Sequence, residues 1–167
     1  MDAMTLEERI ECAARELVDR ARGIGLTLAT AESCTAGLVA ARIADIPGAS
    51  DVLRGGAVTY CDAVKRRVLG VSEDTLRLHS AVSDPCAREM AVGARGLFEA
   101  DMAVSLTGYA GPGGGPLDAP AGTVYIGLAD GRGATCARCS FEGSRNDVRA
   151  HAALCALQML LKRCDDM

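Results

Sequence analysis

The stretch from Thr27 to Ala44 constrains the fold most, because its local pattern changes twice. It opens with the β-rich run Thr27-Leu28-Ala29-Thr30, passes through a polar turn, and continues into a helical pattern. A strand that leads through a short turn into a helix is typical of α/β proteins. Ser33, Cys34 and Thr35 lie in the turn, where we expect the first N–H groups of the helix to lack partners. The turn therefore offers a nucleophile beside backbone groups that can bind an anion.

The rest of the chain alternates β-rich and helical patterns. We expect strands over residues 27–30, 54–60, 102–106, 123–128 and 134–141, and helices after the turn at Ser33 and after the caps Thr5, Asp62, Ser72, Ser83 and either Ser144 or Asn146. This order predicts the α/β class, with a single three-layer α/β/α domain over residues 1–167 and a mixed, mainly parallel sheet.

Three polar segments follow directly after predicted strands, at Ser33, at Tyr60 and at the loop that begins with Thr107. Ligands gather beyond the carboxyl ends of parallel strands, so one crevice could contain all three segments. The loop lacks the spacing of a phosphate-binding P-loop. Its glycines can still let the backbone approach a ligand, and the candidates are Gly108, Gly111, Gly113 and Gly114.

Charge and hydropathy exclude several classes of partner. A net charge of −4 argues against a protein that grips a nucleic-acid backbone through a basic face. No apolar run approaches the roughly 20 residues that span a bilayer, and the first residues do not resemble a secretory leader. We therefore expect a cytoplasmic protein with a small-molecule ligand, no membrane association and no nucleic-acid partner.

The eight cysteines are scattered through apolar patterns in a chain long enough to fold without disulfides. We expect them to be reduced. Cys136 and Cys139 form a C-x-x-C motif, but a spacing of three within a strand points their side chains to opposite faces. With only two histidines in the chain, we expect neither a zinc site nor another cofactor.

A nucleophilic serine needs a base, and lysine is the better candidate. His79 and His151 are the only histidines, and neither follows a predicted strand. Lys65, one of two lysines, lies in the first turn of the helix after Tyr60. Lysine can lose its proton when it is buried, whereas arginine cannot. We expect Lys65 to take the proton from Ser33, which attacks a carbonyl carbon.

Other groups could support that chemistry. Tyr60 could orient the lysine or relay the proton, and N–H groups near Cys34 and Thr35, or in the Gly108 loop, could hold the oxyanion. Arg145 opens the last helix, where an arginine could bind phosphate or carboxylate. The simpler readings stay open at this point: Ser33 as a helix cap, Lys65 and Arg145 as solvated side chains, and Cys34 as either a buried small residue or the nucleophile.

Several ordered motifs carry a resemblance to a known family, at residues 31–37 (AESCTAG), 55–60 (GGAVTY), 81–83 (AVS), 108–114 (GYAGPGG), 122–124 (GTV) and 141–149 (FEGSRNDVR). The chain resembles the CinA C-terminal domain family over nearly its whole length. The resemblance implies an α/β/α fold and a nicotinamide-nucleotide amidohydrolase, which converts nicotinamide mononucleotide and water into nicotinate mononucleotide and ammonia. It also implies Ser33 as the nucleophile, supported by Tyr60 and Lys65.

The resemblance further implies a free-standing form without the larger N-terminal domain of longer CinA proteins, and a homodimer is an open option. Two positions depart from the family pattern, at Tyr109 and at Cys61-Asp62. Asp62 lies three residues before Lys65, and a carboxylate there favours the charged lysine. An inactive nucleotide-binding or protein-interaction module is therefore the alternative to an enzyme.

Overall fold

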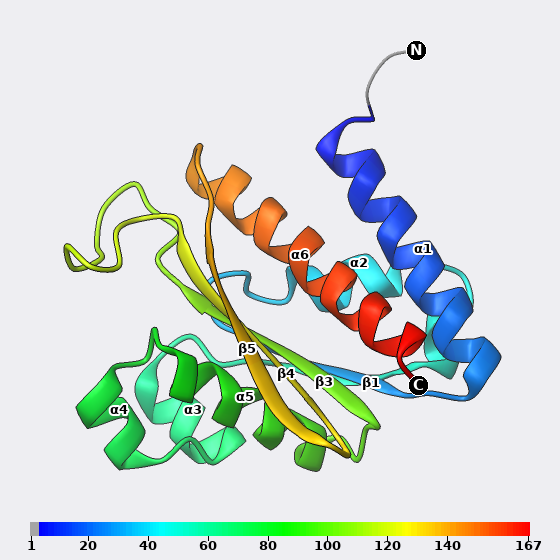
Figure 1. Cartoon of the computed structure of the whole chain (residues 1–167), viewed down its shortest axis with the longest axis horizontal. Helices are drawn as coiled ribbons and strands as arrows, with labels where there is room; N and C mark the ends of the chain where they lie inside the picture. The colour runs from blue at the N-terminus through cyan, green and yellow to red at the C-terminus, as the bar shows by residue number, and fades with distance from the viewer. Residues whose placement is uncertain (1–3) are drawn as a thin grey trace.

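A mixed sheet runs through the computed structural model, which describes residues 4–167 (Figure 1). Within them the strands are β1 (Leu28–Glu32), β2 (Leu53–Val58), β3 (Met102–Gly108), β4 (Thr123–Asp130) and β5 (Gly133–Ser140), in the spatial order β2-β1-β3-β4-β5. β1 pairs in parallel with β2 and β3, whereas β4 pairs antiparallel with both β3 and β5. The predicted mixed sheet is confirmed, and its parallel half carries the strands that precede Ser33, Tyr60 and Tyr109.

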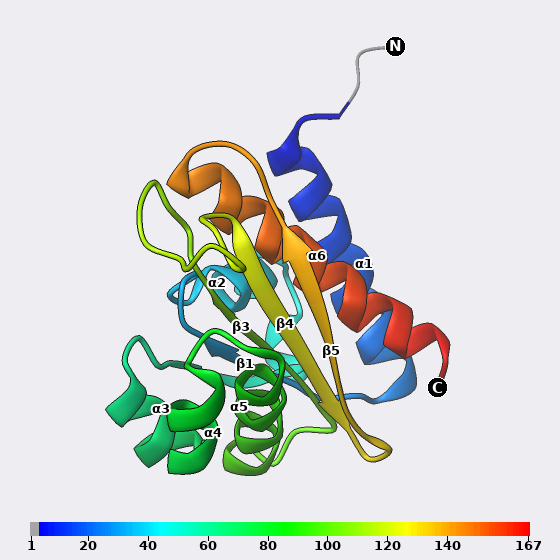
Figure 2. The ribbon, with the colours of Figure 1, turned by 60° about the vertical axis from the view of Figure 1, so that its left-hand side comes forward.

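Helices cover both faces of this sheet. They are α1 (Leu6–Ile24), α2 (Leu38–Ala44), α3 (Asp62–Leu69), α4 (Glu73–His79), α5 (Asp84–Leu97) and α6 (Arg145–Asp165), with a short 3₁₀ turn at Ala49–Asp51. Figures 1 and 2 show α1, α2 and α6 on one face and α3, α4 and α5 on the other. The predicted α/β/α layering is confirmed for the described residues; residues 1–3 of the expected domain lie outside them.

Most helix starts follow their predicted caps. The hydroxyls of Thr5, Ser72, Ser83 and Ser144 each accept the N–H of the residue three positions on, which satisfies an otherwise unpaired donor. Ser144, rather than Asn146, therefore opens α6. The prediction for Asp62 is wrong: Cys61 is the extended residue before α3, and Asp62 is already helical.

The helix after β1 begins later than the sequence predicts. Ala36 and Gly37 adopt left-handed conformations, with φ of 52° and 94°, so right-handed helix cannot begin before Leu38. Residues 33–37 form a separate turn between β1 and α2. Ser33, Cys34 and Thr35 consequently lie ahead of the helix and not in its first turn.

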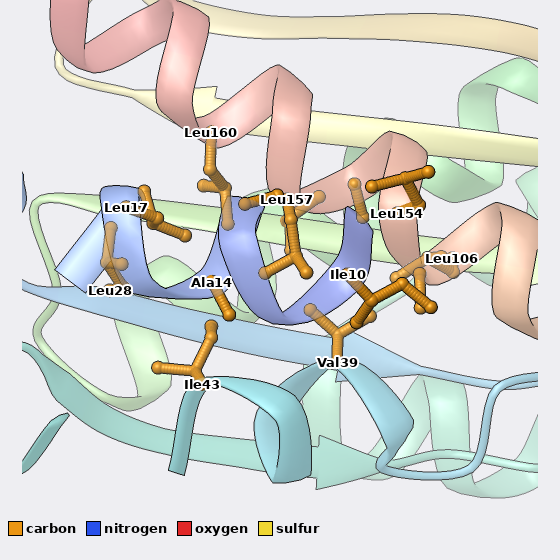
Figure 3. Packing of buried hydrophobic residues seen from close by; sticks show 14 of the residues in the cluster. Ile10, Ala14, Leu17, Leu28, Val39, Ile43, Leu106, Leu154, Leu157 and Leu160 are labelled. Atoms are coloured by element: carbon orange, nitrogen blue, oxygen red, sulfur yellow. The ribbon is translucent and has the colours of Figure 1, made fainter. Parts of the chain in front are cut away.

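The larger core lies between the sheet and the layer of α1, α2 and α6. Figure 3 shows the apolar side chains of α1 packed between those of α6 and α2. The labelled members are almost fully buried: Ile10, Ala14, Leu17, Leu28, Val39, Ile43, Leu106, Leu154, Leu157 and Leu160. Burying a side chain of this size stabilises the fold by about 1.5–3 kcal/mol, so this cluster fixes α6 against the sheet.

None of the helices within residues 4–167 is long and apolar enough to cross a membrane.

Candidate active site

Ser33 lies at the carboxyl end of β1, an interior strand of the sheet between β2 and β3. Its N–H donates to the carbonyl of Leu106 in β3 at 2.9 Å, so the neighbouring strand holds the start of the turn. Only 9% of the residue is exposed. β1 thus places the Ser33 hydroxyl at the edge of the sheet where parallel strands end, as the sequence predicts.

A buried carboxylate, which the sequence reasoning missed, fixes the other end of the turn. Glu32 is fully buried, and its Oε2 accepts the N–H groups of Gly37 and Val39 at 3.0 and 3.1 Å, while Oε1 accepts that of Ala40 at 2.9 Å. The N–H groups at the start of α2 are therefore occupied by the protein's own carboxylate. The predicted anion-binding role can therefore fall only to N–H groups earlier in the turn, and not to those of Gly37, Val39 and Ala40.

Replacing Glu32 by glutamine tests this arrangement. The amide NH₂ of glutamine would face backbone N–H groups, and donors left without acceptors in a buried place cost about 1–3 kcal/mol. We expect Glu32→Gln to lower the free energy of unfolding by about 2 kcal/mol, measured by urea denaturation. The matched control is Glu16→Gln, which removes only an exposed ion pair with Arg20 and should change stability by under ~1 kcal/mol. Equal stability of the two variants would contradict the capping role.

Arg149 of α6 binds two carbonyl groups of the same turn. Its Nε and one Nη donate to the carbonyl oxygens of Cys34 and Thr35, each at 3.0 Å. The Thr35 side chain is fully buried and does not line the hollow described below, so its expected contact with a ligand is not supported. The turn at Ser33 is thus fixed by two side chains: the Glu32 carboxylate accepts its N–H groups, and the Arg149 guanidinium donates to its carbonyl groups.

Lys65 reaches Ser33 from α3. Its Nζ lies 2.9 Å from Ser33 Oγ and donates to the carbonyl of Thr59 at 2.7 Å. The side chain is almost fully buried, with 2% of the residue exposed. Tertiary contact across 32 residues of sequence therefore brings together the predicted nucleophile and the predicted base.

Burial is the main influence on the proton affinity of this lysine. It lowers the pKa of Lys65 below the ordinary value of 10.5, because the charged amine loses its hydration. The nearby acids, including Asp62, act in the opposite direction but do not outweigh burial. Asp62 is itself exposed, so water screens its charge.

This shift sets the expected pH dependence. Only the neutral amine can accept the Ser33 proton, so kcat/KM should rise with pH through the lowered pKa of Lys65 and then level off. Between the lowered pKa of Lys65 and 10.5, the unfolded chain binds more protons than the folded chain. The free energy of unfolding should therefore also rise with pH across this range. A pH–rate profile and parallel denaturation curves measure both, and a rate that falls steadily across this range would contradict a lysine base.

Cys34 is the less suitable nucleophile. Its thiol is buried, and burial raises the pKa of Cys34 to about 11. A thiol acts as a nucleophile in its ionised form, which such a shift suppresses at neutral pH. Cys34 still lines the hollow, so its expected contact with a ligand stands as a prediction.

Tyr60 points to Arg145 and not to Lys65. The Tyr60 hydroxyl oxygen accepts from one Nη of Arg145 at 2.8 Å, and the other Nη donates to the carbonyl of Gly111 at 2.9 Å. Tyr60 is exposed, and no hydrogen bond within residues 4–167 joins it to Ser33 or Lys65. Arg145 therefore ties the end of β2, the glycine-rich loop and the start of α6 together at the rim.

These segments enclose a hollow of about 240 Å³. Most of the predicted site residues line it: Ser33, Cys34, Tyr60, Lys65, Thr107, Gly108, Gly111, Gly113 and Arg145. Gly114 and Thr35 do not. The hydroxyl of Thr107 donates to the carbonyl of Ala81, so it supports the wall. In Figure 1 the loop after β3 and the start of α6 lie toward the same end of the sheet.

Other lining residues were not predicted as part of the site, namely Asp62, Ala81, Val82, Tyr109 and Ala110. A second hollow of about 230 Å³, between α1 and α2, carries four carboxylates and an arginine but no paired nucleophile and base. Within the part of the chain that the structure describes, no group of three or more His, Cys, Asp or Glu residues is placed to hold a metal ion. The hollow around Ser33 contains the paired nucleophile and base and is therefore the candidate active site.

Comparison with known proteins identifies the family of the chain. A family model described as "CinA C-terminal domain" matches residues 10–164. The chain is 47% identical to a CinA-like protein of Thermotoga neapolitana over 136 residues, which is 81% of this chain and 33% of that protein. It is 44% identical to a CinA-like protein of Thermotoga maritima over 156 residues, covering 93% of this chain and 37% of the relative. The chain thus spans about a third of the length of these curated relatives.

Solved structures match over nearly their whole length. The competence/damage inducible protein CihA from Agrobacterium tumefaciens superposes with a TM-score of 0.91 at 36% identity, covering 97% of this chain and 98% of that one. A CinA superfamily protein from Escherichia coli gives a TM-score of 0.90 at 35% identity, with coverage of 98% and 94%. Sequence, fold and relatives agree, and this chain belongs to the CinA C-terminal domain family.

Proposed function

We propose that the chain is a metal-independent amidohydrolase that converts nicotinamide mononucleotide and water into nicotinate mononucleotide and ammonia, as in pyridine nucleotide salvage. The main support for this type of reaction is the buried contact of 2.9 Å between Lys65 Nζ and Ser33 Oγ. The family resemblance supplies the substrate. A serine with an unprotonated amine beside it is suited to attack an amide carbonyl.

The reaction proceeds in two halves. Neutral Lys65 takes the hydroxyl proton as Ser33 Oγ attacks the carboxamide carbon, and the C–N bond then breaks as Lys65 returns the proton to the leaving ammonia. An ester on Ser33 results. Water attacks this ester while neutral Lys65 accepts one proton from the water. The C–O bond to Ser33 then breaks as Lys65 returns that proton to Ser33 Oγ, and the carboxylic acid product releases its own proton to solvent to become the carboxylate.

The surroundings suit these steps. Within residues 4–167 the N–H of Cys34 donates to no backbone carbonyl, so it is a candidate donor to the oxyanion, together with N–H groups of the loop after Gly108. The carbonyl of Thr59 holds Lys65 Nζ in place between steps. The hollow is small for a nucleotide, so the phosphate would extend to the rim, where Arg145 offers a guanidinium.

Ammonia release from nicotinamide mononucleotide by the purified chain tests the proposal directly. The expected result is turnover with stoichiometric nicotinate mononucleotide. Calorimetric binding of the mononucleotide without product would instead favour the inactive binding module. Neither binding nor turnover would exclude this substrate.

A further inference from the structure

Two cysteines meet between β5 and α6, away from the hollow at Ser33. Their sulfur atoms, Cys139 Sγ and Cys155 Sγ, lie 3.8 Å apart, and both side chains are partly buried. A small oxidant can therefore reach them, while the packing around them holds them close. A disulfide brings its sulfur atoms to about 2.0 Å, a change that side-chain rotation and a slight approach of the two elements can supply.

This contact is one of two that align the segment of β5 with α6. Cys139 and Phe141 are two residues apart, on one side of the extended chain, and Cys155 and His151 are four apart, on one side of α6. The rings of Phe141 and His151 stack with centroids 5.9 Å apart. Two neighbouring contacts thus align the same two segments, so the cysteine pair is held in register.

Reactivity is also concentrated at this pair. Either sulfur can donate in this contact; with the Cys155 thiol as the donor, the hydrogen bond lowers the pKa of Cys139 to about 7 and raises that of Cys155. By contrast, burial raises the pKa of Cys136 to about 12. At neutral pH Cys139 therefore has much of the thiolate character that oxidation requires, with a resolving thiol beside it.

We propose that Cys139 and Cys155 are a modification site at which hydrogen peroxide forms a reversible disulfide. The Cys139 thiolate attacks one peroxide oxygen, the O–O bond breaks, and the leaving hydroxide takes a proton to become water. The Cys155 sulfur then attacks the Cys139 sulfenic acid, the S–S bond forms, and the S–O bond breaks to release a second water. The two thiols are oxidised by two electrons and the peroxide is reduced.

The disulfide would close a ring around the start of α6. The two cysteines are 16 residues apart in the sequence, and the ring includes Arg145, which spans the rim, and Arg149, which holds the turn at Ser33. Drawing β5 and α6 together moves the segment that carries both arginines. We expect the oxidised form to be more stable and to hydrolyse the substrate more slowly; the second expectation rests on the proposed function.

Peptide mapping tests the modification without reference to activity. The full chain is treated with hydrogen peroxide, free thiols are alkylated, and the protein is digested with trypsin without reduction. The expected product joins residues 139–145 to residues 150–162 and disappears after treatment with dithiothreitol. The unfolding temperature of the oxidised chain should rise by about 5–10 °C. The proposal would be overturned if the map showed mainly single cysteines oxidised to sulfinic or sulfonic acid. Disulfides formed mainly through the exposed Cys12 and Cys61 would overturn it as well.

Variants separate the pair from its surroundings. Cys139→Ser and Cys155→Ser should each abolish the cross-link and the rise in unfolding temperature. Cys136→Ser, on the opposite face of the same strand, should leave both unchanged. The hydrolysis rate of the oxidised chain should fall on the order of tenfold and recover with dithiothreitol. A mapped disulfide with an unchanged rate would overturn the regulatory part alone, whereas a reduced chain without turnover would count against the proposed function.

Discussion

Ser33→Ala should lower kcat for ammonia release on the order of 10⁴-fold, because the ester intermediate cannot form without the hydroxyl. The substitution removes one oxygen from a residue held by its backbone, so the fold and the hollow should persist. Binding of nicotinamide mononucleotide should therefore be retained. Steady-state rates give the loss in kcat, and calorimetry gives the dissociation constant.

Ser50→Ala is the matched control for this variant. Ser50 is exposed in the turn before β2 and lies outside the hollow, so its loss should leave the rate within twofold or so of the unmodified chain, as surface substitutions usually do. If Ser33→Ala keeps most of the activity while alkylation of Cys34 abolishes it, the nucleophile is the thiol. If both variants turn over normally, the hydrolysis occurs elsewhere in the molecule.

Lys65→Met should be the second large loss, with kcat falling on the order of 10³-fold. Methionine nearly fills the buried space of the lysine stem but has no amine to accept the Ser33 proton. Stability should fall little, because the variant loses the hydrogen bond to Thr59 but also removes an amine that burial disfavours in its charged form. A flat pH–rate profile in the residual activity would show that the titrating base has been removed.

The control for Lys65 is the other lysine. Lys162 is exposed near the end of α6 and does not line the hollow, so Lys162→Met should leave both the rate and its pH dependence unchanged. Lys65→Arg keeps the positive charge and cannot act as a base, but its larger head must enter a buried site. Activity in either Lys65 variant that matches the unmodified chain would rule out the lysine as the proton acceptor.

The hydroxyl caps and the succession of strands and helices along the chain follow from local sequence. Thr5, Ser72, Ser83 and Ser144 precede apolar periodic segments, and capping depends on residues within one turn of the cap. The exceptions lie beside the site. The left-handed Ala36 and Gly37 delay α2, and alanine gives no local signal for such a conformation.

By itself, the sequence determined the α/β order, the three polar strand ends and the choice of Ser33 and Lys65, because periodicity, turn residues and side-chain chemistry are local properties. Only the tertiary structure decided which groups these residues contact. Glu32 accepts N–H groups at the start of α2, Arg145 donates to the Tyr60 hydroxyl, and burial lowers the pKa of Lys65 despite the nearby Asp62. Those contacts join segments that are brought together by packing, and desolvation depends on every element around a group, which no local pattern records.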